Sequence, residues 1–279
     1  MNDKCEICLN KKCDVVGSCD CDGCGRAGVC YRQLSPTVRI TTQCTQECAH
    51  CCFSCSPSKT DMMSVEMAKS INAFCLKNKI SKLNVMGGEF FCNPDWVNIV
   101  DILSKDMTKV RLVTNSDWFV SEDIKKNILD LFGKNKTLYF ALSYDDWHTN
   151  RYVDTAARWL DENDISFQIE NWGEAQQNTI LPLGRAETNY IGTVYDIFSA
   201  YCRNPNRLYS FLIVENGNIY ACPLSKRFYL GNVEDDLYTF RSTYAEKKKP
   251  IIDNIMSCGQ CNRLYMFMEQ TKKDGVRCV

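Results

Sequence analysis

The middle of the chain alternates between short apolar runs and longer segments with helical periodicity. Four apolar runs rich in β-forming residues begin near Lys82 (KLNVM), Val110 (VRLVT), Leu138 (LYFALS) and Ser166 (SFQIE), each 28 residues after the last. This spacing is the length of a strand–helix unit with short loops. An earlier run, TVRIT, predicts a first strand, and TILPL near residue 181 is a candidate sixth strand.

Two segments between these strands have clear helix signals. SVEMAKSINAFCLKN starts at a capping serine, and SEDIKKNILDLFG starts at another and stops at a glycine. Apolar residues recur on one face of each predicted helix: Met67, Ile71, Phe74 and Cys75 after the cap Ser64, and Ile124, Ile128 and Phe132 between the cap Ser121 and Gly133. Repeated right-handed units of this kind predict a parallel α/β sheet, either doubly wound or curled into a full or partial barrel.

Composition limits the class of protein. The chain has 279 residues, of which 45% are hydrophobic, enough for one large core with a small appendage. Lys+Arg 33 against Asp+Glu 34 leaves a net charge of -1, which argues against nucleic acid as a partner. The start, MNDKCEICLN, has no apolar signal segment, and no stretch approaches eighteen apolar residues. We therefore expect a cytoplasmic protein with no membrane partner.

The chain contains 19 cysteines, which is unusual for its length. In a reducing compartment, clustered thiols hold metal more often than they form disulfides. Cys44, Cys48 and Cys51 follow the first strand with the spacing CX3CX2C, and three thiolates can hold three corners of an iron–sulfur cube. The fourth iron then stays open to a small molecule. Cys48, Cys52 and Cys55 have the same spacing in an overlapping register, and we favour the first set because Cys44 follows the strand closely.

These residues resemble the radical S-adenosylmethionine (SAM) enzymes over roughly residues 36 to 190. His50 supplies the ring before the third cysteine, the second strand ends in MGGEF, TNS and SYD end later strands, and LPLGRAE is also familiar from this family. The resemblance implies an α/β fold, a partial (β/α)6 TIM-like barrel, with a [4Fe–4S] cluster on Cys44, Cys48 and Cys51. It also implies contacts to SAM from these strand-end residues: Gly87, Gly88, Glu89, Thr114, Asn115, Ser143 and Asp145.

The chemistry that the resemblance implies is reductive cleavage of SAM. The open iron would chelate the amino and carboxylate groups of SAM, and the resulting 5′-deoxyadenosyl radical would take hydrogen from a substrate C–H bond. A one-electron donor such as flavodoxin or ferredoxin is then a required partner. Exposed clusters would also make the enzyme oxygen-sensitive, which favours an anaerobic setting.

A second set of cysteines resembles the auxiliary-cluster extension called SPASM or, in its shorter form, twitch. Its pattern, CX14GX4C followed by CX2C, is met by Cys202, Gly217, Cys222, Cys258 and Cys261. ENGNIYACP predicts a β-hairpin that turns at Asn216–Gly217 and carries Cys222 beyond its second strand. We expect one auxiliary [4Fe–4S] cluster on the four cysteines, with a zinc tetrathiolate as the alternative.

Seven more cysteines precede the first strand: Cys5, Cys8, Cys13, Cys19, Cys21, Cys24 and Cys30. Zinc and a further iron–sulfur cluster fit them equally well, and no ligand set can be chosen. The expected organisation is a cysteine-rich metal-binding cap at 1–35, a radical SAM core at 36–195 and a twitch/SPASM-like domain at 196–279. The roles of Cys52, Cys55, Cys92 and Cys278 stay open, although packing is favoured for Cys92 and a surface-loop position for His148.

The substrate is expected to be a peptide or protein, modified as in the maturation of ribosomally made peptides. No fused leader-recognition domain is expected, because the first strand begins near residue 36. The alternatives are a small-molecule dehydrogenase or biosynthetic enzyme of the radical SAM type, and a non-catalytic zinc-binding module.

Overall fold

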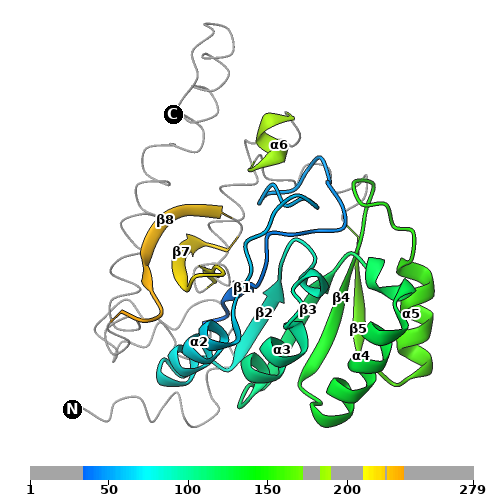
Figure 1. Ribbon diagram of the computed structural model, residues 1–279, viewed down its shortest axis with the longest axis horizontal. Helices are drawn as coiled ribbons and strands as arrows, with labels where there is room; N and C mark the ends of the chain where they lie inside the picture. Colours follow the sequence, from blue (N-terminus) through cyan, green and yellow to red (C-terminus); the bar gives the residue numbers. More distant parts are fainter. Residues whose placement is uncertain (1–33, 172–182, 190–209, 224, 236–279) are drawn as a thin grey trace, which may run out of the picture.

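One eight-stranded sheet organises the protein, in the order β5-β4-β3-β2-β1-β6-β7-β8 (Figure 1). The computed structural model describes residues 34–171, 183–189, 210–223 and 225–235. The first five strands run parallel in chain order: β1 (Thr37–Arg39), β2 (Lys82–Met86), β3 (Lys109–Thr114), β4 (Leu138–Tyr144) and β5 (Phe167–Asn171). On the other side of β1, β6 (Leu212–Ile213) is parallel to it, and β7 (Asn218–Cys222) and β8 (Ser225–Asn232) follow antiparallel.

Helices connect the parallel strands. The helices are α2 (Val65–Lys77), α3 (Trp96–Ser104), α4 (Glu122–Lys134) and α5 (Val153–Glu162), with 3-10 turns η2 (Phe90–Cys92) and η3 (Asp117–Val120) and a short α6 (Arg185–Thr188). Connections between parallel strands of one sheet are right-handed. Because β1–β5 follow one another across the sheet without reversal, the four long helices lie along one side of these strands (Figure 1).

The elements predicted from the hydrophobic pattern are confirmed for β1–β5, α2 and α4. The hydroxyl of Ser64 accepts a hydrogen bond from the Met67 amide, and that of Ser121 accepts one from Ile124, as the capping prediction requires. Helix α4 continues one residue past Gly133, to Lys134. Most of the proposed sixth strand, TILPL, lies outside the described residues, and its last residue, Leu183, is in a loop before α6.

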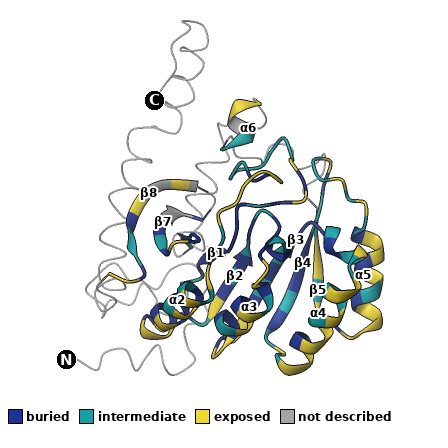
Figure 2. Cartoon of the chain, in the orientation of Figure 1, coloured by how far each residue is buried: buried dark blue, intermediate teal, exposed yellow. Residues whose placement is uncertain are grey.

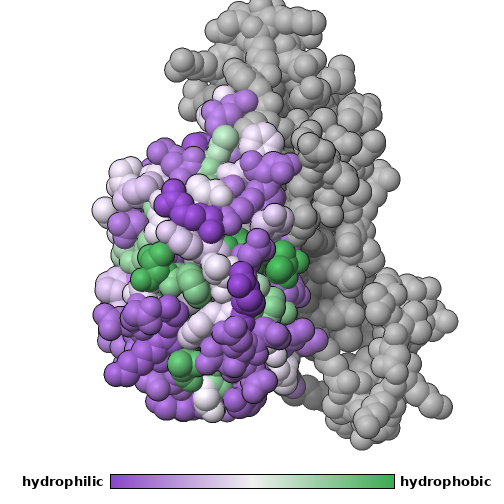
Figure 3. Space-filling model, turned by 90° about the vertical axis from the view of Figure 1, so that its right-hand side faces the viewer, coloured by the Kyte–Doolittle hydropathy of each residue, from purple (hydrophilic) through white to green (hydrophobic). Residues whose placement is uncertain are grey.

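Buried and half-buried residues alternate along β2 and β3, so the two faces of the sheet differ. Leu83 and Val85 of β2, with Val110 and Leu112 of β3, are buried in the hydrophobic core. Figure 2 shows buried stretches along the central strands behind the helices. The intervening positions are half-buried and more polar, and they include Arg111 of β3, which forms an ion pair with Glu170 of β5. Hydrophilic residues dominate the outer surface seen in Figure 3, where hydrophobic ones are scattered.

The predicted hairpin at Asn216–Gly217 is present. Gly217 has φ +79°, and a Cβ there would lie 2.8 Å from side-chain atoms of Met67 and Val233. Cys222 is the last residue of β7 rather than beyond it. The hairpin extends the sheet that contains the parallel strands, because β6 pairs with β1.

A buried ion pair also joins β1 to this hairpin. The Arg39 guanidinium donates two hydrogen bonds to the Glu215 carboxylate, 2.5 and 2.9 Å long, and the two side chains are 1% and 7% exposed. None of the helices among the described residues has the length and apolar character that a membrane crossing requires.

Candidate active site

The loop that follows β1 brings three predicted cysteines together at the carboxyl ends of the parallel strands. Cys44 is buried, whereas Cys48 and Cys51 are half-buried. The Cys51 amide donates to the Cys48 carbonyl at 3.1 Å, and the Cys44 amide donates to the Ser56 carbonyl at 3.1 Å. The loop therefore folds back on itself, with Cys48 and Cys51 on one turn and Cys44 held at the start of the loop.

The electrostatics of these thiols fit an iron–sulfur cluster. Burial raises the pKa of Cys44 above its ordinary value, and burial with the charge of Cys51 raises the pKa of Cys48 to about 12. The pKa of Cys51 is lowered to about 6, chiefly by a hydrogen bond with Cys55. Backbone amides of Gln46 and Cys55 donate to the sulfurs of Cys44 and Cys51, each at 3.4 Å. A bound cation stabilises neighbouring thiolates that would otherwise repel one another. N–H groups that donate to the sulfurs stabilise their negative charge as well.

Cys55 lies close to the favoured trio. It is 1% exposed, and its hydrogen bond with Cys51 together with burial raises its pKa above the ordinary value. Cys52 is half-buried in the same loop. Both remaining thiols of the motif thus lie on the same loop as Cys51, and Cys55 contacts it.

The two glycines of MGGEF pack against the cysteine loop. A Cβ on Gly88 would lie 2.3 Å from the Gln43 carbonyl oxygen and 2.7 Å from the Cys44 Cβ. The Gly88 amide donates to the Thr41 carbonyl at 2.9 Å, and the Glu89 amide donates to the Gln43 carbonyl at 2.9 Å. A glycine is needed here because the backbone of the second strand end touches the loop that carries Cys44.

Glu89 connects the ends of β2 and β3. Its carboxylate accepts hydrogen bonds from the Thr114 hydroxyl at 2.9 Å and the Asn115 amide at 2.8 Å. Burial raises the pKa of Glu89 to about 7, and its Oε1 is buried without a partner among the described residues. The Asn115 side chain donates to Thr45 at 2.9 Å and approaches the Cys44 sulfur at 3.8 Å. Glu89 is therefore hydrogen-bonded to Thr114 and Asn115, Asn115 approaches Cys44, and Oε1 of Glu89 is available to accept from a ligand.

The segment LGRAE holds the cysteine loop from the other side. The Arg185 side chain donates to the carbonyls of Cys48 at 3.0 Å and Cys55 at 2.5 Å, and its amide donates to the Cys51 carbonyl at 2.9 Å. Gly184 has φ +58°, and a Cβ there would lie 2.4 Å from the Cys52 carbonyl oxygen. The motif stands out in the sequence, but its pattern alone assigns no role to Arg185.

Replacing Arg185 by methionine is expected to weaken cluster retention. The variant keeps the aliphatic stem but loses two hydrogen bonds that fix the loop, which should cost about 2 to 4 kcal/mol of loop stability. Lysine should rescue little, because it lacks the planar fork that reaches two carbonyls. The rate of iron release to a chelator measures the effect, with exposed Arg158→Met of α5 as the control. Equal release rates in Arg185→Met and wild type would contradict this role.

The carboxylate of Asp145 lies near both histidines of the chain, His50 and His148. Its carboxylate accepts from the amides of Trp147 at 2.9 Å and His148 at 3.0 Å, and from His148 Nδ1 at 2.8 Å. Burial favours a raised pKa for Asp145, but the hydrogen bond and charge of His148 outweigh it and the pKa is lowered. The interpretation of His148 as a surface-loop histidine is wrong, because its side chain is 17% exposed and fixed by Asp145.

His50 faces this pair from the cysteine loop. Its ring centroid lies 4.9 Å from that of His148 and 6.1 Å from that of Trp147. Burial and the charge of His148 lower the pKa of His50 to about 4, so its ring is neutral near pH 7. Ser143 stands apart from this group, half-buried within β4 beside Glu170 of β5.

A polar network that the sequence did not reveal joins the cysteine loop to two other strand ends. Gln46 donates to Asp117 at 3.0 Å and to Thr149 at 2.9 Å, and accepts from the Thr149 amide at 3.2 Å. Next to it lies an open hollow of about 510 Å³. Its lining includes Cys48, Asp117, Trp147, Arg151 and Tyr152. Single polar residues in loops give no periodic signal, so only the fold could identify them.

The other predicted metal ligands lie mostly outside the described residues. This holds for Cys202, Cys258 and Cys261 and for all seven cysteines of the N-terminal segment. The backbone of Cys222 is described at the end of β7, paired with Ser225.

Two curated relatives from Bacillus subtilis (strain 168) match part of the chain. One is "Putative peptide biosynthesis protein YydG", 28% identical over 117 residues, which are 40% of this chain and 36% of YydG. The other is "Antilisterial bacteriocin subtilosin biosynthesis protein AlbA", 29% identical over 92 residues, 33% of this chain and 20% of AlbA. The chain thus matches about a third and a fifth of the lengths of these relatives. No family model matches it.

Solved structures with the same fold include BtrN in complex with AdoMet and 2-DOIA, with a TM-score of 0.50 at 14% identity over 75% of this chain and 86% of BtrN. Streptococcus suis SuiB bound to precursor peptide SuiA has a TM-score of 0.51 at 16% identity, over 76% of this chain and 65% of SuiB. The fold is that of BtrN and SuiB. The predicted resemblance and the predicted TIM-barrel-like α/β class are therefore confirmed. In this fold the cysteine loop follows the first strand, beside the ends of β2 and β3.

Proposed function

We propose that the chain is a radical SAM enzyme that modifies a peptide. The observation that carries this proposal is the packing of Cys44, Cys48 and Cys51 on one loop against Gly88 and Asn115, with N–H donors directed at two of the sulfurs. Three thiolates in this arrangement suit a [4Fe–4S] cluster with one open iron. The relatedness to YydG and AlbA, whose names refer to peptide and bacteriocin biosynthesis, supports the choice of substrate class.

Cys44, Cys48 and Cys51 would hold the cluster, and the chemistry supplied by cluster and SAM is one-electron cleavage to a 5′-deoxyadenosyl radical. Glu89 Oε1 is positioned to accept a hydrogen bond from the amino group of SAM, because it is buried and has no partner among the described residues. Gly87, Thr114, Asn115, Ser143 and Asp145 are the other proposed contacts. Arg185 and Gly184 keep the cysteine loop in place.

The hollow beside Cys48 is the proposed substrate entrance. At about 510 Å³ it falls within the usual range for ligand sites, and Trp147 and Tyr152 offer aromatic surface while Arg151, Glu47 and Asp117 offer charge. Such a mixed, open lining suits a peptide segment better than a small enclosed metabolite. SuiB, which shares the fold, was solved bound to its precursor peptide.

We also propose an auxiliary [4Fe–4S] cluster on Cys202, Cys222, Cys258 and Cys261 in a domain of residues 196–279. A metal-bound cap at 1–35, a core at 36–195 and an electron donor of the flavodoxin or ferredoxin type belong to the same proposal. The position of Cys222 next to the Gly217 hairpin supports it, because this is where the spacing pattern requires a ligand.

The test is anaerobic incubation of the reconstituted, reduced enzyme with SAM, followed by chromatography for 5′-deoxyadenosine. We expect 5′-deoxyadenosine to form, and a precursor peptide supplied as substrate to change in mass. Deoxyadenosine without peptide modification, together with oxidation of a small alcohol, would favour the alternative of a small-molecule dehydrogenase. Absence of both cluster and deoxyadenosine would contradict the enzyme proposal itself.

A further inference from the structure

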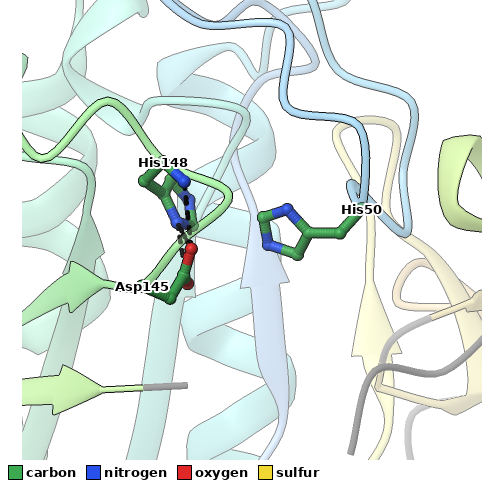
Figure 4. A group of neighbouring side chains, drawn as sticks. All are labelled: His50, Asp145 and His148. Carbon is green, nitrogen blue, oxygen red and sulfur yellow. Dashed lines mark hydrogen bonds and ion pairs between the residues drawn. The ribbon is translucent and has the colours of Figure 1, made fainter. Parts of the chain in front are cut away.

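The two histidines and Asp145 form a second group of metal-ligating side chains, separate from the thiols. Ligand atoms of His50, Asp145 and His148 all lie within 4.8 Å of one another. Figure 4 shows the His50 ring extending from the cysteine loop toward the Asp145–His148 pair, which is joined by hydrogen bonds. His50 Nδ1 is buried and has no hydrogen-bond partner within the described part of the chain.

The carboxylate fixes how His148 can act. Nδ1 of His148 is 2.8 Å from both carboxylate oxygens of Asp145, so the other ring nitrogen, Nε2, is left for another partner. Histidines that bind metal commonly have their second nitrogen held in this way by a carboxylate, which sets the tautomer and the ring orientation. His148 is therefore already arranged as a metal ligand would be.

The two loops that carry the histidines are joined beside the group. Gln46, four residues before His50, donates to the hydroxyl of Thr149 at 2.9 Å and accepts from the Thr149 amide at 3.2 Å. Thr149 directly follows His148. Two nitrogens bound to one four-coordinate ion lie about 3.4 Å apart, given bonds of about 2.0 to 2.1 Å. The ligand atoms of the group lie within 4.8 Å of one another in the structure, so at most a small movement of the two rings is needed to reach this spacing.

We propose that His50 and His148 bind one divalent transition-metal ion of the zinc class, with Asp145 orienting His148. Imidazole nitrogens are preferred ligands of such ions, and the carboxylate supplies compensating charge. Two protein ligands leave positions for water or for a molecule that enters the neighbouring hollow, which is lined by Cys48 and Trp147. The ion would also link the loop after β1 to the loop after β4.

The test uses the full chain with its thiols first loaded with iron and sulfide, so that added zinc competes less with iron for cysteine. Zinc affinity is measured against a chelator, and zinc K-edge X-ray absorption identifies the neighbouring atoms. The chain has only 2 histidines, so any imidazole scattering must come from His50 and His148. We expect imidazole scattering in the wild type, and zinc affinity about 10- to 100-fold lower in Asp145→Asn.

A matched control is available next to Asp145. Asp146 is exposed, and Asp146→Asn should leave the zinc affinity unchanged while altering the net charge by the same amount. His148→Ala should abolish the imidazole scattering with the iron content preserved. Zinc surrounded by sulfur alone in the wild type, or equal affinity in Asp145→Asn and Asp146→Asn, would overturn the proposal. The wild-type spectrum decides the matter even if a variant folds poorly.

Discussion

The Cys44→Ala variant is expected to lose about four irons per chain and to cleave SAM at least about 100-fold more slowly than the wild type. Cys44 is the most buried thiol of the trio and lies against Gly88 and Asn115, so no other thiol can take its place without moving the end of β2. Iron and sulfide analysis after anaerobic reconstitution, with 5′-deoxyadenosine counted by chromatography, measures both effects.

Two further cysteine variants make this result specific. Cys75 is fully buried in α2, so Cys75→Ala controls for the loss of a buried thiol and should keep the iron. Cys55→Ala should also retain SAM cleavage, although Cys55 contacts Cys51. If Cys55→Ala alone abolished cleavage while Cys44→Ala retained it, the ligands would be Cys48, Cys52 and Cys55 instead.

The Glu215→Ala variant is expected to lower the free energy of unfolding by about 3 to 5 kcal/mol. It leaves the Arg39 guanidinium buried and uncompensated at the junction between β1 and the hairpin, where the side chain is 1% exposed. Because β1 leads directly into the cysteine loop, a looser junction should also speed iron loss. Chemical denaturation followed by circular dichroism measures the stability.

Removing both charges provides the matched comparison. The double variant Arg39→Met/Glu215→Leu has no isolated buried charge, so it should be far less destabilised than Glu215→Ala. The ion pair Glu122–Lys125 of α4 serves as a second control, because the Glu122 side chain is 85% exposed, and Glu122→Ala should cost less than about 1 kcal/mol. Equal destabilisation by Glu215→Ala and Glu122→Ala would show that the buried pair contributes no more than a surface one.

Much of the site was predictable because its residues follow strands in fixed spacing. A strand that alternates in hydrophobicity ends at a definite residue, and parallel strands in chain order bring those ends to one edge. This is why Cys44, Glu89 and Asn115 could be expected near one another before their contacts were known. The contacts between them could not be predicted from the sequence. The structure shows that Gly88 packs on the cysteine loop and that Glu89 accepts hydrogen bonds from Thr114 and Asn115.

Other residues needed the fold because their partners are far away in sequence. Arg185 is 137 residues from Cys48, and Glu215 is 176 residues from Arg39, so no local pattern marks either contact. His148 gave only the weak signal of a lone histidine in a loop. Its burial follows from the approach of the cysteine loop, which places His50 across from it.

The sequence by itself determined the succession of strands and helices, the capping of α2 and α4, the hairpin turn at Gly217 and the thiol spacing after β1. Each of these depends on interactions between residues that are close along the chain. Only the tertiary structure decided which loops meet, and so it alone paired Asp145 with His148, set Arg185 against the cysteine loop and placed β6 beside β1. These contacts form when the whole chain buries its apolar surface, and that collapse is not a local property.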